Sequence, residues 1–276
     1  MSEIVKHQIS SALSPRAAAE FGKIVSGVPA IASALEEGGW IAGGFARNLL
    51  LDLPAADYFS DTRDHKPGDI DIFFPSVESA NRAIDRAKEA GRGVQPSFGG
   101  FAVESSFKIK GSGSSKIQFV NHESLVRPSI NETLEAFDIA NCRVAITKSE
   151  VYYSDDWHAL ESKKLIRVCH GNTPFLGSRI LKYLEHRGLD GLTEDSNEML
   201  TGWFAHACKD FNEGKWESGH INGSQGHIKR LYEKNLMKRD NLIFFIGKYH
   251  EVIKSESYGE SMIVDWALHK MGVSAA

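Results

Sequence analysis

Two aspartates, Asp69 and Asp71, stand one residue apart in the stretch KPGDIDIFF, which is otherwise apolar after its glycine. If this stretch is a strand, both carboxylates share one face, roughly 6–7 Å apart along the chain. That spacing lets both carboxylates chelate one hard cation such as Mg²⁺, or lets one of them bridge two cations. An isolated pair of this kind more often lies on a solvated strand face, so the interpretation depends on its neighbours.

The neighbouring motif is IAGGFARNLLLD, in which Gly43 and Gly44 end an apolar run and an amphipathic stretch follows. Glycines at a strand-to-helix turn let backbone N–H groups approach a phosphate without interference from a Cβ atom. Arg47 falls in the first turn of the expected helix, where a guanidinium adds a charge-assisted contact to a triphosphate. Together with the two aspartates, this order of residues predicts a phosphate cradle beside a metal clamp.

The elements around these motifs follow from periodicity and capping signals. Residues 14–37 are predicted as a helix, because Ser14 and Pro15 form a good N-cap and first helical position. We expect a strand over 40–44, a helix over 45–52 and an inserted polar loop over 53–68.

The second set of elements begins with the strand 69–74, where polar and apolar residues alternate. A capped helix over 76–91 and a hairpin of strands 101–110 and 116–120 around the Gly/Ser turn 111–115 come next. Further predicted elements are a helix-like stretch 129–138, strands 141–147 and 151–154, a short helix 155–163 and a strand 164–169. From about residue 173 long amphipathic stretches dominate, which predicts a domain of mixed strands and helices over 1–170 and a helical domain over 171–276.

Bulk composition is that of a soluble globular chain, with 42% hydrophobic residues and a formal net charge of −4. There is no overall basic field that would indicate nucleic-acid binding. The three cysteines, Cys142, Cys169 and Cys208, are widely spaced and fit a reducing compartment. The first residues lack the apolar run of a signal peptide and LIFFIG is too short to cross a bilayer, so we expect a cytoplasmic protein without a membrane partner.

The run AGGFARNLLL…DIDIFF resembles the signature of the polymerase-β nucleotidyltransferase superfamily, and most closely its branch of CCA-adding enzymes and bacterial poly(A) polymerases. The resemblance implies an α+β fold, with a mixed-sheet nucleotidyltransferase domain followed by a mostly helical domain. It implies transfer of a nucleoside monophosphate from an NTP to an acceptor, with release of pyrophosphate and with Mg²⁺, or alternatively Mn²⁺, as the cofactor. Asp69 and Asp71 would be the catalytic metal ligands, and Gly43, Gly44 and Arg47 would bind the triphosphate.

Two later stretches extend the resemblance. In AFDIANCRVAI, Asp138 and Asn141 match family positions, with imperfect spacing, that contact the ribose or orient an arginine. In LGSRILKYLEHRG, Arg179 and Lys182 match an arginine and a basic residue that approach the nucleotide.

The sequence also departs from the family pattern. Many members carry a third carboxylate on a neighbouring strand, where this chain offers the neutral amide Gln118. Glu104 and Asp138 are the alternatives for the third ligand, and the choice stays open from sequence. Asn48 follows Arg47 where CCA-adding enzymes usually have an aspartate, which weakens the expectation of that particular activity.

The expected acceptor is RNA, with tRNA 3′ ends first by analogy, and a protein or small molecule second. The alternative from another class is a catalytically silent module of the same fold that binds a nucleotide or a partner. A basic stretch, 227–240, could follow an RNA backbone, although a solvated helix face is the simpler interpretation. No spacing of the 11 histidines or the cysteines predicts zinc, and the oligomeric state is not readable.

Overall fold

The structure is a computed structural model that describes residues 2–53, 69–97, 100–109, 113–170, 179–180, 183–184 and 188–196. The loop predicted over 53–68, apart from Leu53, lies outside the described residues. So does most of the predicted helical domain, including the basic stretch 227–240. The chain divides into two compact units, Met1–Leu160 and Glu161–Ala276. The domain boundary predicted at residue 170 stays a prediction.

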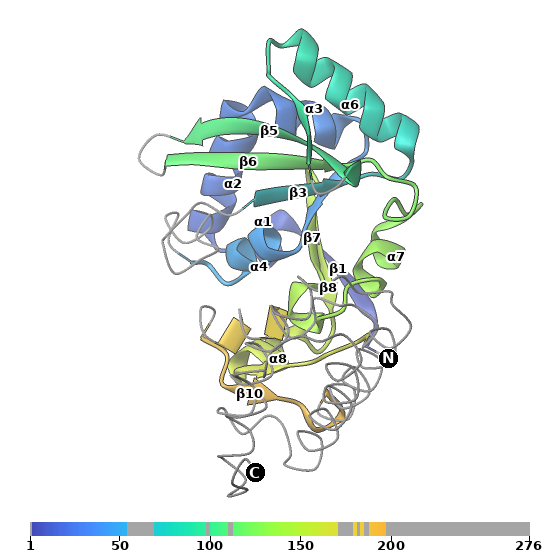
Figure 1. The fold of residues 1–276 in the computed structure, drawn as a ribbon. Coiled ribbons are helices and arrows are strands. Elements are labelled where there is room, and N and C mark those ends of the chain that lie inside the picture. The colour runs from blue at the N-terminus through green and yellow to red at the C-terminus, as the bar shows by residue number, and fades with distance from the viewer. Residues whose placement is uncertain are drawn as a thin grey trace, which may run out of the picture. The chain divides into compact units, whose positions relative to one another are not determined.

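The first unit is built on an eight-stranded sheet with the order β1-β8-β7-β2-β3-β6-β5-β4 (Figure 1). β3 and β6 pair in parallel and the other neighbours pair antiparallel, so the sheet is mixed and the predicted α+β class is confirmed. In that order the strands are Ile4–Gln8, Glu150–Ser154, Val144–Ile146, Trp40–Ala42, Asp69–Phe73, Gly113–Val120, Ala102–Ile109 and Gln95–Ser97.

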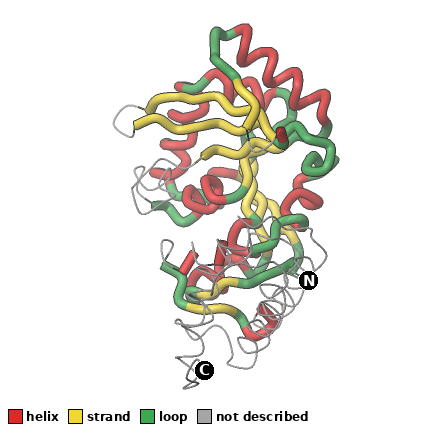
Figure 2. The backbone as a smooth tube through the Cα atoms, in the orientation of Figure 1, coloured by secondary structure: helices red, strands yellow, loops and turns green. Residues whose placement is uncertain are grey.

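One face of this sheet carries the main hydrophobic core. Ile70 and Ile72 of β3 are fully buried there, together with Phe119 of β6. The helices that contribute to this core are α2 (Pro15–Gly27), α3 (Pro29–Glu36), α4 (Gly44–Leu50) and α6 (Val77–Glu89). In Figure 1, α2 passes behind β5 and β6, and Figure 2 shows the same helices in red against the yellow strands. This packing fixes the apolar side of β3, so its polar side must face away from the core.

Serine caps begin two of these helices where the sequence predicts them. The Ser14 Oγ accepts a hydrogen bond from the N–H of Ala17 at 3.1 Å, at the start of α2. The Ser76 Oγ accepts one from the N–H of Ser79 at 3.2 Å, at the start of α6. Each serine satisfies a backbone donor of the first helical turn that has no partner within the helix.

The single helix expected over 14–37 is instead two helices, α2 and α3. Pro29 disfavours helical geometry at the residue before it, Val28, whose φ and ψ are −127° and 87°. The axes of the two helices meet at 98°. In the described part of the chain no single helix is long and apolar enough to cross a membrane, although this bent pair together passes that test of length and composition.

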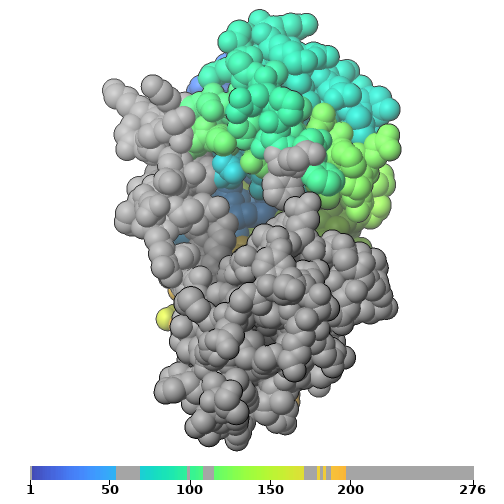
Figure 3. Space-filling model, in the orientation of Figure 1, coloured from blue at the N-terminus to red at the C-terminus, as the bar shows by residue number. Residues whose placement is uncertain are grey.

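Helix α6 has an apolar side and a charged side. Ala80, Ala83 and Ile84 are among its buried residues, whereas its charged residues lie on the outer side. The described surface of α6 and of the strands after it is drawn in turquoise and green in Figure 3. The helix therefore closes one part of the main core and presents charge to solvent.

A second, smaller core contains residues from β2, β7 and the helix α7 (Ile130–Glu135). Leu134 of α7 packs with Trp40, Ala42 and Ala145. The remaining described elements are α1 (Ile9–Ala12), the 3₁₀ turn η2 (Ala140–Cys142), α8 (Trp157–Ser162), and the parallel pair β9 (Leu165–Ile166) and β10 (Gly191–Leu192) of the second unit.

Two further sequence predictions need correction in detail, and three short elements were not predicted. β6 begins at Gly113, so the Gly/Ser turn of the hairpin is shorter than the predicted 111–115. The strand expected over 164–169 is only the two residues of β9. The sequence does not predict the short edge strands β1 and β4 or helix α1, because their few residues carry neither a clear alternation nor a long apolar stripe.

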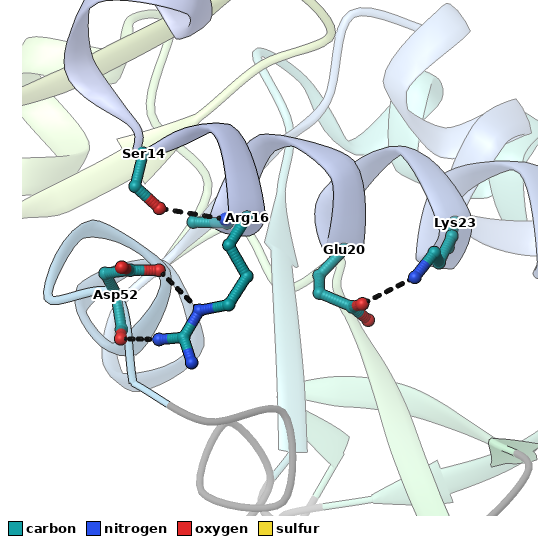
Figure 4. A network of polar contacts seen from close by, with 6 residues as sticks. Ser14, Arg16, Glu20, Lys23 and Asp52 are labelled. Carbon is teal, nitrogen blue, oxygen red and sulfur yellow. Dashed lines mark hydrogen bonds and ion pairs between the residues drawn. The ribbon is translucent and has the colours of Figure 1, made fainter.

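A polar contact fastens the end of α4 to the start of α2 (Figure 4). Arg16 donates to the Asp52 carboxylate at 3.0 Å and also to the Asp52 backbone carbonyl. Asp52 adopts a left-handed φ of 52°, which ends the helical path. A hydrogen bond from Ser14, followed by the contact with Arg16, lowers the pKa of Asp52 below its usual range. The helix that follows the two glycines is therefore held at its far end.

Candidate nucleotide and metal site

Asp69 and Asp71 lie on the same face of β3, as the alternation predicts. Asp69 is exposed and Asp71 is half-buried, whereas Ile70 between them has no exposed surface. Asp71 is in register with Ala42 at the end of β2 and with Gln118 on β6. The two carboxylates therefore stand on the side of the sheet away from the main core.

The turn at Gly43 lies directly beside Asp71. β2 ends at Ala42, and Gly43 has φ 87° and ψ −142°, a conformation that residues with a side chain rarely adopt. A Cβ atom at position 43 would lie 4.0 Å from the Asp71 Oδ2 and 3.7 Å from the Phe137 ring. The fold thus brings the glycine motif and the aspartate motif together, although they stand apart in the sequence.

Arg47 belongs to the same turn, but its side chain is buried. The Arg47 backbone N–H donates to the Gly43 carbonyl at 2.9 Å, and only 1% of the residue is exposed. Asn48 beside it is equally buried. The predicted contact between Arg47 and a triphosphate stays a prediction, and it would require a phosphate to reach a side chain that the fold encloses.

Gln118 lies on the neighbouring strand β6, where the resemblance led us to expect a third acid. It is in register with Asp71, and its Nε2 donates to the Asp69 Oδ2 at 3.0 Å. An amide N–H in this position holds one aspartate oxygen and adds no negative charge. Gln118 therefore orients Asp69 and does not enlarge the acidic cluster.

Glu104, the second alternative, lies one strand further away. Glu104 is on β5, in register with Gln118 of β6. About two strand spacings, roughly 10 Å, therefore separate it from β3, the strand that carries the aspartates. Its carboxylate accepts hydrogen bonds from Gln95 at 2.6 Å, Ser97 at 2.9 Å and Lys116 at 3.0 Å. These hydrogen bonds hold the pKa of Glu104 below its usual range, and the bond from Gln95 has the largest effect. Glu104 is thus engaged away from the two aspartates.

Asp138, the third alternative, and Asn141 lie in the segment after α7. Both are buried, with 6% and 0% of their surface exposed. The Asn141 carbonyl accepts a hydrogen bond from the Trp157 Nε1 at 3.1 Å. Their predicted roles at a ribose stay predictions, but Phe137 in the same segment reaches the Gly43 turn, so the segment borders the site.

Sequence reasoning missed Arg143, which shapes this segment. Its guanidinium donates to the carbonyls of Glu135 at 2.7 Å and Phe137 at 3.1 Å, and only 7% of the residue is exposed. The available signal is its place two residues after Asn141, within the stretch that resembles the family. Arg143 fixes the backbone that presents Phe137 and Asp138.

Of the two nucleotide-binding residues predicted in the helical half, the structure describes only one. Arg179 is exposed and belongs to the second unit. Lys182 lies outside the described residues. Their contact with a nucleotide stays a prediction.

The donor set of the first unit fits a single hard cation. Two carboxylates on one strand face, one of them exposed, are what Mg²⁺ takes from a protein when substrate phosphates and water complete its coordination. Among the residues that the structure describes, no group of three or more His, Cys, Asp or Glu side chains could hold a metal ion. Of the described residues, Asp69 and Asp71 are the two that would bind such a cation.

Comparison with known families finds one match. A family model described as "Gad2: Gabija anti-defense 2 family protein" matches residues 16–163, which is more than half of the chain. No curated protein matches the chain.

Solved structures with the same fold include CCA-adding enzymes. A complex of a CCA-adding enzyme with ATP has a TM-score of 0.54 at 15% identity, covering 96% of this chain and 66% of that one. A complex with CTP has 0.53 at 12% identity, covering 98% and 71%. The Thermotoga maritima enzyme complexed with tRNA has 0.50 at 14% identity, covering 96% and 65%. At these identities the likeness establishes only that the chain has the fold of CCA-adding enzymes. The chain spans about two thirds of the length of those enzymes.

Proposed function

The chain belongs to the Gabija anti-defense 2 family, and we propose that it is a nucleotidyltransferase that moves a nucleoside monophosphate from an NTP to an acceptor. The observation that carries the proposal is the position of Asp71 beside the Gly43 turn, with Asp69 on the same face of β3, in a chain with the fold of CCA-adding enzymes. The family description further supports an acceptor whose modification counters a defence system.

In the proposed reaction, an acceptor oxygen forms a bond to the α-phosphorus and the bond from that phosphorus to the bridging oxygen breaks. Pyrophosphate leaves, and the acceptor hydroxyl loses its proton. A divalent cation bound by Asp69 and Asp71 would neutralise phosphate charge and favour the deprotonated acceptor. Gln118 keeps the Asp69 carboxylate in place, and the Gly43 turn brings backbone without a Cβ atom next to Asp71.

For the acceptor, RNA is the first proposal and the 3′ end of tRNA the leading example. The support is that one structure with this fold is a complex with tRNA. A protein is the second acceptor to test, because a factor that counters a defence system could act on one of its components. A silent binding module is the competing function, and it is favoured by Gln118, which stands where a third acid would aid turnover.

The test is transfer of label from each α-labelled NTP, with Mg²⁺, to total cellular RNA and to cell protein. We expect label on one of these acceptors, and we expect Asp69→Asn and Asp71→Asn to abolish transfer. Asp85→Asn is the matched control, because Asp85 is an exposed carboxylate on α6 paired with Lys88. Tight binding of Mg·NTP with no transfer to any acceptor would favour the silent module, and absence of both would overturn the proposal.

A further inference from the structure

Lys116 lies next to the two aspartates but does not contact them. It is in register with Asp69 on the adjacent parallel strand and shares the face of Asp69 and Gln118. Its Nζ instead donates to both oxygens of Glu104, at 3.0 Å and 3.1 Å. A cation that could cancel part of the acidic site is thus held one strand away from it.

Glu104 is built to remain charged. Its side chain is 6% exposed, and Gln95 and Ser97 of β4 donate to its two oxygens besides Lys116. Because the carboxylate has these two other donors, it would keep partners if Lys116 moved away. The pair is therefore asymmetric, with a fixed anion and a cation whose side chain is 48% exposed on a flexible four-carbon stem.

The charges that the described residues of the first unit bring to the site are compatible with an additional cation. Two carboxylates match the charge of one divalent cation, so the negative charge of a triphosphate is left for cations of the protein. Arg47, the cation of the glycine motif, is 1% exposed. Lys116 is exposed and its stem starts beside Asp69, and a lysine ammonium is a common phosphate ligand.

We propose that Lys116 is a substrate-contacting residue that leaves Glu104 to bind the phosphates of the nucleotide held at Asp69 and Asp71. Glu104 is then a positioning residue, which keeps the ammonium away from the aspartates until phosphate arrives. This inference rests on the proposed function, since it assumes that a nucleotide occupies the site.

The experiment measures the affinity of full-length protein for a non-hydrolysable ATP analogue in the presence of Mg²⁺, by calorimetry. Lys116→Met should weaken binding about tenfold or more, the loss expected for a charge-assisted hydrogen bond. Glu104→Gln should leave binding unchanged or tighten it, because it removes the anion that competes for the ammonium. A merely structural ion pair would make both variants weaken binding alike.

Lys6→Met is the matched control. Lys6 is also a strand lysine, 55% exposed, and it pairs with Glu150 at 3.2 Å at the far edge of the same sheet. We expect the affinity of this variant to stay within about twofold of wild type, as for a surface ion pair remote from the ligand. Thermal unfolding of each variant identifies any loss that comes from misfolding.

The outcomes separate this inference from the proposed function. If wild type binds the analogue and Lys116→Met binds it equally well, the inference is overturned and the proposed function stands. The same holds if Glu104→Gln and Lys116→Met lose affinity together. If folded wild type binds no NTP analogue of any of the four bases, the proposed function itself fails.

Discussion

Replacing Gly43 with alanine tests how the site is assembled. Gly43 has φ 87° and ψ −142°, while a Cβ there would meet Phe137 at 3.7 Å and Asp71 Oδ2 at 4.0 Å, which are ordinary contact distances. The cost of Gly43→Ala therefore comes from backbone strain and not from a clash. Strain of this kind costs about 1–3 kcal/mol.

Gly44→Ala is the control, and it should behave in the opposite way. Gly44 is the first residue of α4, its φ is not positive, and a Cβ there would have no atom within 4 Å. Removing a glycine from such a position stabilises a protein by about 0.4–1 kcal/mol, because it restricts the unfolded chain. The two adjacent glycines thus predict changes of opposite sign in the free energy of unfolding.

The assay is urea denaturation of both variants followed by intrinsic fluorescence, with thermal unfolding as a second measurement. For a chain of this size each kcal/mol corresponds to roughly 2–4 °C in Tm. The same proteins are then tested for binding of Mg·NTP. Gly44→Ala should fold normally and bind more weakly if phosphate approaches the backbone there. Equal stability of Gly43→Ala and wild type would refute the reasoning about the turn.

Three further predictions concern single side chains. Gln118→Glu replaces a neutral amide with a third carboxylate beside Asp69. The affinity for Mn²⁺, measured by electron paramagnetic resonance, should therefore increase. Unchanged affinity would show that this position does not face the cation. The pKa of Glu104 is lower in the folded chain than its usual value of 4.5, so its stabilising contribution is present above that pH and is lost as the pH falls through the lower pKa of the folded state. Denaturation at neutral and at acidic pH should accordingly show a smaller loss of stability for Glu104→Gln than for wild type, and equal losses would contradict this assignment. Trp157→Phe removes the donor to the Asn141 carbonyl in a buried site and should cost about 1–3 kcal/mol in the free energy of unfolding, whereas a change near zero would mean that water replaces the indole.

Local patterns predicted the centre of the fold well. The alternation in DIDIFF placed Asp69 and Asp71 on one face, and the serines at 14 and 76 cap the helices that they were expected to start. These features depend on residues close together in the chain. The periodicity does not predict the break between α2 and α3 at Val28, because the apolar stripe continues across it. Pro29 is the sequence signal that could have predicted the break.

The candidate site was predicted only in part, because its geometry depends on strand pairing. The hydrogen bond from Gln118 to Asp69 follows from the parallel register of β3 with β6. The ion pair of Lys116 with Glu104 follows from the hairpin of β5 and β6. The burial of Arg47 likewise results from packing of α4 in the main core. Spacing along the chain carries no information about these contacts between strands and layers.

The interior position of β3 has a consequence for how the site responds to damage. β2 and β6 pair with β3 on its two sides, so the strand that carries the aspartates does not lie at an edge of the sheet. Its amides should exchange with solvent mainly through global unfolding, while the edge strands β1 and β4 exchange through local fraying. Core substitutions that lower the stability of the sheet would then reduce the fraction of working molecules, and the surviving molecules would keep the spacing of the two carboxylates.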